Sequence, residues 1–112
     1  MTVEKYFSTG PPHERPVFDA VLAYVEALGP VHVEPVSVGV FIKKSGSWLE
    51  LRPMTKWVAL SFSLPRRIHH PKIARKPIDT GTKVFHVVNL RTPDDLTEDI
   101  KAWLAESYQF AD

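Results

Sequence analysis

Apolar side chains recur every three or four residues in the first part of the chain. Between residues 15 and 28 they fall on one face of a helix, at Phe18, Val21, Leu22, Val25 and Leu28. A glycine and a proline follow at 29 and 30 and should end this helix. Upstream, Thr2 can cap a short helix that runs to Phe7, before the Gly-Pro-Pro break at residues 10–12. A short helix followed by a longer amphipathic one is therefore predicted.

The period of the pattern changes from about 3.6 to 2 between residues 31 and 64, where β-branched and aromatic residues are dense. This change predicts four strands, at residues 31–36, 38–43, 48–52 and 57–64, with turns at 45–47 and 53–56. A fifth strand is predicted at residues 84–90, after a loop at 66–82. The links among the first four strands are too short for parallel crossovers, so these strands should be antiparallel.

The start of a final helix is indicated by Thr92, which can act as the cap, Pro93 in the first turn and Asp95 three residues after the cap. Its apolar stripe would consist of Leu96, Ile100, Trp103, Leu104 and Tyr108, so the helix should run to about residue 108. The predicted fold is a single α+β domain over residues 1–112. It has two layers, a mainly antiparallel five-stranded sheet with an N-terminal and a C-terminal helix on one face.

Composition narrows the classes of function. The chain has 112 residues, 44% of them hydrophobic, and a net charge of +1. The absence of cysteine removes disulfides, thiolate nucleophiles and iron–sulfur ligation, and it fits a reducing cytoplasm. No apolar run approaches the ~20 residues that cross a bilayer, and the N-terminus lacks the order of a secretory signal. We therefore expect a soluble cytoplasmic protein with no membrane partner and no cofactor.

Basic and imidazole side chains concentrate in residues 66–76, which contain no acid. Arginine offers a planar fork of donors and lysine a mobile point charge, and both suit a phosphate or another anion. We expect an anionic group to be contacted by Arg66, Arg67, His69, His70 and Lys72. The alternative is a solvated loop whose charge offsets the acids of the final helix.

Two helices can cover one face of such a sheet and leave the other partly open. The open face would carry Trp57, Ala59, Ser61 and Ser63, and Trp57 and His86 are the candidate groove residues. An apolar floor with a basic rim suits an anionic small molecule or an acidic peptide. A second copy of the chain could cover the same face, giving a homodimer. The predicted function is a ligand-binding or protein-interaction module.

Two other classes of function remain open. The first is a small enzyme in which His70 or His86 acts as acid and base, since histidine titrates near neutrality, although no catalytic motif is present. The second is nucleic-acid binding, with Trp48 and Trp57 stacking on bases; the nearly neutral charge does not favour it. A metal site is not favoured either, because adjacent histidines such as His69 and His70 rarely aim at one ion.

The chain resembles an uncharacterised bacterial family, a domain of unknown function whose fused members are sometimes labelled predicted transport proteins. The resemblance spans nearly the whole chain and implies a compact α+β domain, with no activity attached. It rests on Tyr6-Phe7, residues 25–30, residues 57–64 with Pro65-Arg66-Arg67, His70-Pro71, His86, Leu90, Pro93, Asp95-Leu96 and Trp103-Leu104. The resemblance implies that the Pro-Arg-Arg and His-Pro segments belong to the family pattern.

Overall fold

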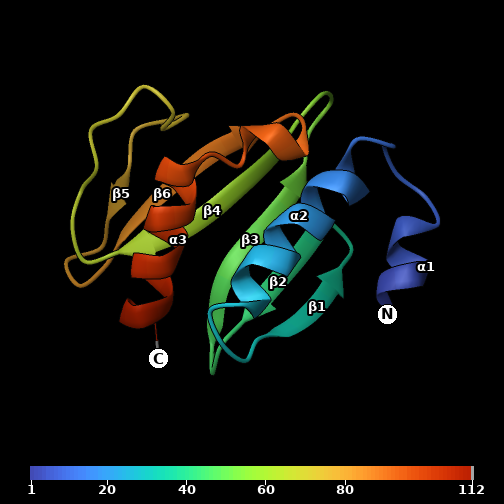
Figure 1. Cartoon of the computed structure of the whole chain (residues 1–112), viewed down its shortest axis with the longest axis horizontal. Helices are drawn as coiled ribbons and strands as arrows, with labels where there is room; N and C mark the ends of the chain where they lie inside the picture. The colour runs from blue at the N-terminus through green and yellow to red at the C-terminus, as the bar shows by residue number, and fades with distance from the viewer. Residues whose placement is uncertain (112) are drawn as a thin grey trace.

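Helices stand at both ends of the chain and strands occupy its middle (Figure 1). The computed structural model describes residues 1–111, apart from the side chain of Ser47. The elements in order are α1 (Val3–Phe7), α2 (Glu14–Glu26), β1 (His32–Val36), β2 (Gly39–Lys43), β3 (Ser47–Pro53), β4 (Val58–Leu64), β5 (Ile78–Asp79), β6 (Val84–Leu90), the 3-10 turn η1 (Pro93–Asp95) and α3 (Glu98–Phe110). No helix in residues 1–111 is long and apolar enough to cross a membrane.

The strands form one sheet in the order β1-β2-β3-β4-β6-β5, and every neighbouring pair is antiparallel. The predicted antiparallel pairing and the α+β class are confirmed. The predicted number of five strands is wrong, because the loop contains the two-residue strand β5. Ile78 pairs with Phe85 and Asp79 with Val84 at the outer edge of β6. So short a strand has no periodicity of its own and exists only through this pairing.

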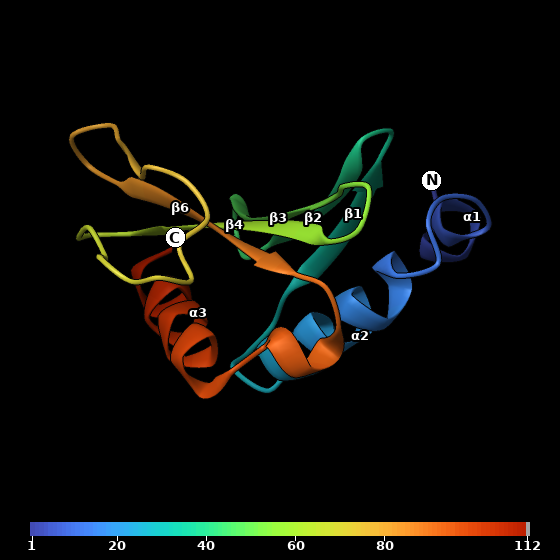
Figure 2. The ribbon, with the colours of Figure 1, turned by 90° about the horizontal axis from the view of Figure 1, so that it is seen from above.

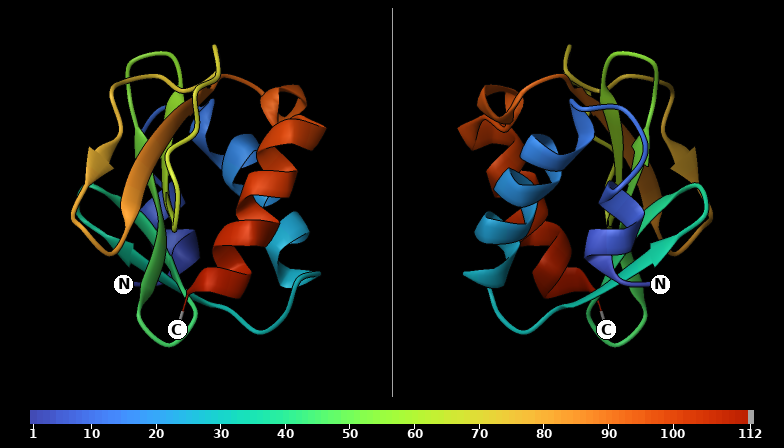
Figure 3. Two further views of the ribbon diagram at one scale, coloured as in Figure 1. Left: turned by 90° about the vertical axis from the view of Figure 1, so that its left-hand side faces the viewer. Right: turned by 90° about the vertical axis from the view of Figure 1, so that its right-hand side faces the viewer.

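Helices α2 and α3 lie on the same face of the sheet, and α1 stands apart beside the β1 edge (Figures 2 and 3). Alternate side chains of the central strands β4 and β6 point into this helix layer. They pack on the apolar stripes of the two long helices and form the core, which includes Val58, Leu60, Phe62, Leu64, Val88, Leu90, Phe18, Val21, Ile100 and Leu104. In the described part of the chain no helix covers the opposite face of the sheet.

The predicted start of the first helix is confirmed, whereas the predicted start of the last helix is wrong. Thr2 caps α1 as expected, since its hydroxyl accepts a hydrogen bond from the Lys5 amide at 3.1 Å. The predicted start of the last helix at Thr92 is wrong: its capping box closes the 3-10 turn η1 instead. Leu96 then adopts a non-helical ψ of 76°, and α3 starts afresh at Glu98, after Thr97.

Polar contacts fasten α3 to the sheet. The indole Nε1 of Trp48 donates to the Ser107 hydroxyl at 2.8 Å, and this hydroxyl donates to the Ser63 carbonyl at 2.7 Å. At the end of the helix, the Lys44 ammonium donates to the carbonyls of Tyr108 at 2.8 Å and Ala111 at 3.0 Å. A cation here satisfies carbonyls left free at a helix C-terminus and complements its dipole. The position of α3 over the sheet is therefore fixed by hydrogen bonds as well as by packing.

Candidate ligand-binding groove on the open sheet face

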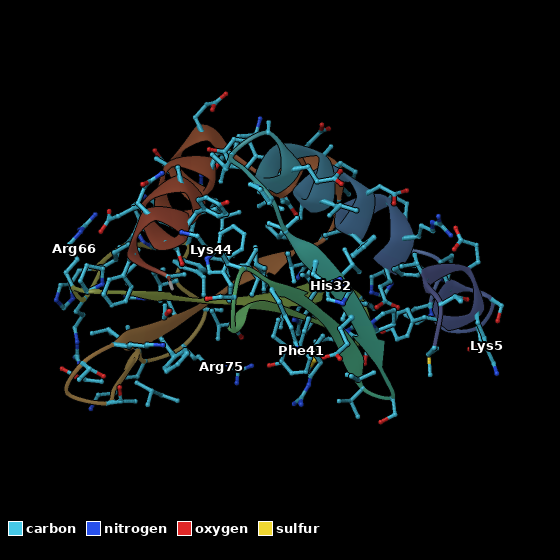
Figure 4. The ribbon with its side chains drawn as sticks, turned by 90° about the horizontal axis from the view of Figure 1, so that it is seen from below. Lys5, His32, Phe41, Lys44, Arg66 and Arg75 are labelled. Carbon is cyan, nitrogen blue, oxygen red and sulfur yellow. The ribbon has the colours of Figure 1, made fainter. Side chains whose placement is uncertain are left out.

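Part of the basic segment pairs with acids of α3. The guanidinium of Arg66 donates to both carboxylate oxygens of Glu106, at 3.0 and 2.8 Å, and this carboxylate raises the pKa of Arg66. The Lys72 ammonium lies 3.7 Å from the Asp99 carboxylate, and the His70 Nε2 lies 3.6 Å from it. In Figure 4, Arg66 lies at the outer side of α3. These side chains therefore tie the loop to the helix.

Two further members of the predicted anion site, Arg67 and His69, are exposed. Neither forms an ion pair within residues 1–111. His70 is half-buried because its ring packs edge-on against Trp103, with the ring centroids 5.0 Å apart. The structure thus spreads the predicted cluster along the loop and gathers no three of its side chains around one point. Within the same described range, no group of three histidine, aspartate or glutamate side chains could hold a metal ion.

His86 lies in the helix-covered core and is 0% exposed. Its Nε2 accepts a hydrogen bond from the Ile68 amide at 3.0 Å, and its ring stacks on Phe62 at 5.5 Å. Its Nδ1 is buried without a hydrogen-bond partner among the described residues. Burial lowers the pKa of His86, Arg66 and Arg67 lower it further, and the Val84 carbonyl opposes them without completing a well-formed bond. His86 is therefore a neutral core residue that does not reach the open face.

Trp57 lies immediately before β4 and is half-buried. The Arg91 guanidinium carbon lies 5.8 Å from its ring centroid, and its carbonyl is 3.2 Å from Nε2 of His13. The open face has a cavity further along the sheet, and Trp57 does not line it. Of the predicted open-face residues, Ser61 alone lines this cavity.

The open face carries a cavity of about 270 Å³, which we call the open-face groove. Register places Phe41, Glu50, Ser61 and Val87 in one row across four strands, so their side chains share the face opposite the helices. Beside this row, the lining includes side chains from the end of the long loop and the strands β5 and β6, namely Arg75, Lys76, Ile78 and Phe85. Ile78 is 63% exposed and Phe85 40% exposed. The groove is thus mainly apolar and open to solvent.

Arg75 and Lys76 supply the positive charge of this groove. Both are exposed, and neither forms an ion pair within residues 1–111. The backbone just before them is held in place, because the Ala74 amide donates to the Val87 carbonyl at 2.7 Å. Figure 4 shows Arg75 and Phe41 on the same helix-free side of the sheet. The one acid of the lining, Glu50, lies 3.9 Å from Arg52, which offsets its charge.

The open sheet face predicted from the sequence is present, but most residues that line its cavity were not predicted. One available signal was the outward side of β6: Val84, His86 and Val88 point inward, so Phe85 and Val87 had to point away from the helices. Two apolar residues at outward positions of one strand indicate a covered or ligand-binding surface. Arg75 and Lys76 were visible as members of the basic segment, but their separation from Arg66 depends on the path of the loop.

The fold and the groove define a two-layer α+β domain with one open sheet face. A family model described as Domain of unknown function (DUF5655) matches residues 3–111, and the chain belongs to this family. The resemblance stated from the sequence is thereby confirmed. A search of curated proteins found no match, and neither did a search of solved structures.

Proposed function

We propose that this domain is a binding module that holds a small anionic molecule with an apolar body in the open-face groove. One observation carries the proposal: two cations without ion pairs, Arg75 and Lys76, border an apolar cavity of about 270 Å³. This volume is slightly below the range for small-molecule sites, about 300–1,000 Å³, and therefore suits a small ligand. The proposed function is thus the ligand-binding module expected from the sequence. The basic side chains that we now assign to the anion are Arg75 and Lys76.

Each part of the ligand has a counterpart in the groove. A flat apolar body would lie against Phe41, Val87 and Phe85 and remove their exposed surface from water. A carboxylate or phosphate at its end would accept two hydrogen bonds from the Arg75 guanidinium and face the Lys76 ammonium. Arg66, His70 and Lys72 would contribute indirectly, because their pairs with α3 hold the loop that carries these two cations.

The first experiment is a titration with phenyl phosphate, followed in ¹H–¹⁵N spectra, with benzyl alcohol and inorganic phosphate as matched probes. Phenyl phosphate has both the apolar body and the anion, whereas each control has one of them. We expect phenyl phosphate to bind most tightly and to shift the amides of Phe41, Ser61 and Val87. Equal binding of inorganic phosphate would show that the apolar floor has no part in recognition.

Two double substitutions that each remove one arginine and one lysine test the position of the anion. The Arg75→Gln/Lys76→Gln protein should bind phenyl phosphate at least about tenfold more weakly, because a hydrogen bond to a charged group contributes about 1.5–3 kcal/mol and tenfold corresponds to about 1.4 kcal/mol. The control, Arg67→Gln/Lys83→Gln, removes one arginine and one lysine that are exposed and outside the groove lining. Loss of binding in the control alone would return the anion site to the start of the loop.

A third variant uses the acid of the groove. Glu50→Gln removes the one carboxylate that lines the groove and should increase the affinity for phenyl phosphate, with little effect on benzyl alcohol. No binding of phenyl phosphate by any of these proteins would overturn the proposal. Sedimentation velocity would then test the other prediction for this face, a homodimer buried over Ile78 and Phe85.

A further inference from the structure

A second cavity lies at the opposite end of the sheet, where α1 approaches the edge strand β1. It has a volume of about 350 Å³, and Glu14, in the first turn of α2, lines it. Although glutamate is charged, Glu14 is only 2% exposed. Acidic side chains are rarely buried to this degree without a partner, so the surroundings of this carboxylate point to a function.

The Glu14 carboxylate uses only one of its two oxygens within the protein. Oε2 accepts a hydrogen bond of 2.5 Å from the Tyr6 hydroxyl. Oε1 faces Gly10, since a β-carbon built there would lie 3.6 Å from it. No donor in residues 1–111 bonds Oε1, and this oxygen therefore remains available to the cavity, whose further lining includes Ser8, Thr9, Pro11, Val36 and Ser37.

No cation of residues 1–111 forms an ion pair with this carboxylate, although Met1 and Lys5 line the same cavity. Lys5, on α1, points away from the sheet in Figure 4 and forms no ion pair within the described residues. His13, which precedes Glu14 in the chain, has its Nε2 3.2 Å from the Trp57 carbonyl. Burial raises the pKa of Glu14, while the Tyr6 hydroxyl and His13 lower it. Burial and the neighbouring carboxylate raise the pKa of Tyr6, which therefore stays protonated and donates.

We propose that the cavity beside Glu14, which we call the Glu14 pocket, binds a small primary ammonium ion. The ammonium donates to Oε1 and supplies the charge that the buried carboxylate lacks. A short aliphatic body lies against the Tyr6 ring, Pro11 and Val36, and the hydroxyls of Ser8, Thr9 and Ser37 are within the lining for a polar end. This site is separate from the open-face groove and has ligands of the opposite charge.

The chemistry of the pocket selects an organic ammonium over a metal ion. Calcium takes six to eight oxygen ligands and magnesium an octahedron, whereas this pocket has a single carboxylate. A neutral alcohol of the same size could bond Oε1 but would leave its charge uncompensated. A quaternary ammonium would bring charge without an N–H donor. The position at the start of α2 favours the ionised carboxylate, because the helix dipole is positive there.

The test compares four solutes added to the folded protein: n-butylammonium chloride, 1-butanol, tetramethylammonium chloride and sodium chloride at the same ionic strength. Backbone amides of residues 8–10 report binding in ¹H–¹⁵N spectra. We expect saturable shifts with n-butylammonium and at least tenfold weaker binding of 1-butanol and tetramethylammonium. Equal binding of 1-butanol, or equal binding of tetramethylammonium, would overturn the proposal.

Variants then locate the site. Glu14→Gln should abolish the response to n-butylammonium, whereas Glu26→Gln, at an exposed position of the same helix, should retain it. Unchanged binding by Glu14→Gln would refute the assignment.

A measurement on the unsubstituted protein covers the case in which Glu14→Gln fails to fold. The pH titration of the Glu14 side-chain carboxyl is followed by its ¹³C shift, with and without saturating n-butylammonium. The titratable groups around this carboxyl are Tyr6, which donates to it, the adjacent His13, and Met1 and Lys5, which line the same cavity. The pKa of Glu14 is raised overall, mainly by burial. Because the ligand binds the ionised form, the pKa should fall as the ligand concentration rises. An unchanged titration would overturn the proposal without any variant.

Discussion

Replacing His86 by phenylalanine should destabilise the protein near neutral pH, and this loss of stability should shrink or change sign as the pH falls. The ring of His86 is buried, stacks on Phe62 and accepts a hydrogen bond from the Ile68 amide. His86→Phe keeps the stack but leaves that buried amide without an acceptor, which costs about 1–3 kcal/mol. The variant should therefore be less stable than the original protein at pH 7.5, where His86 is neutral in both the folded and the unfolded protein.

The difference changes at lower pH because the folded protein resists protonation of His86. Its folded pKa is lowered from 6.5 by burial, so below that pH the unfolded chain binds a proton that the native state does not. Stability attributable to His86 is thus complete above pH 6.5 and falls as the pH drops through the unfolded value. The maximum slope for one proton is about 1.4 kcal/mol per pH unit, which amounts to up to about 2 kcal/mol by pH 5.

Urea unfolding, followed by tryptophan fluorescence at pH 7.5, 6.0 and 5.0, measures this difference. The stability lost on His86→Phe should shrink between pH 7.5 and 5.0 and approach zero or change sign. Other titrating groups, including Glu14, are present in both proteins and cancel in the comparison. His69→Gln, at an exposed histidine, serves as the control and should keep the original pH profile. Parallel profiles for the original protein and His86→Phe would refute a neutral, buried His86.

Two further substitutions test the attachment of α3. Gly29→Ala would place a β-carbon 2.3 Å from the Tyr108 hydroxyl, so it should lower the free energy of unfolding in urea by about 1–3 kcal/mol. The control is Gly46→Ala, whose β-carbon would have no neighbouring atom within 4 Å and should change stability by less than about 0.5 kcal/mol. Ser107→Ala leaves the buried Trp48 indole without its acceptor and should cost about 1–3 kcal/mol by the same assay; an unchanged midpoint would exclude that hydrogen bond.

Local patterns predicted the regular elements well because each carries its own period. The strand predicted at residues 84–90 is β6 with the same bounds, and its inward and outward residues alternate without interruption. The last helix was misjudged because Thr92, Pro93 and Asp95 are a valid start signal that a 3-10 turn also satisfies. Nothing in the local sequence shows that Leu96 leaves the helical region, whereas in the structure the turn contacts the distant helix α2.

The candidate sites depended on contacts between distant segments, which residue patterns do not contain. Arg66 and Arg75 belong to one basic segment, yet Arg66 pairs with Glu106 whereas Arg75 lines the open-face groove. Glu14 has the sequence features of an exposed acid in a first helical turn. It is nevertheless buried, and Tyr6 of α1, eight residues upstream, donates to it. The chemical character of the residues was thus predictable, and their grouping was not.

The strand order also determines when the sheet is complete during synthesis. One edge of β4 pairs with β3, which has already been made, but the other pairs with β6, which follows a long loop. Until residues 84–90 leave the ribosome, β4 exposes an unpaired edge in a segment, Val-Ala-Leu-Ser-Phe-Ser-Leu, without a single charge. Such an edge can pair with another nascent chain. The β4 edge is therefore open to such pairing from the emergence of Leu64 from the ribosome until that of Leu90.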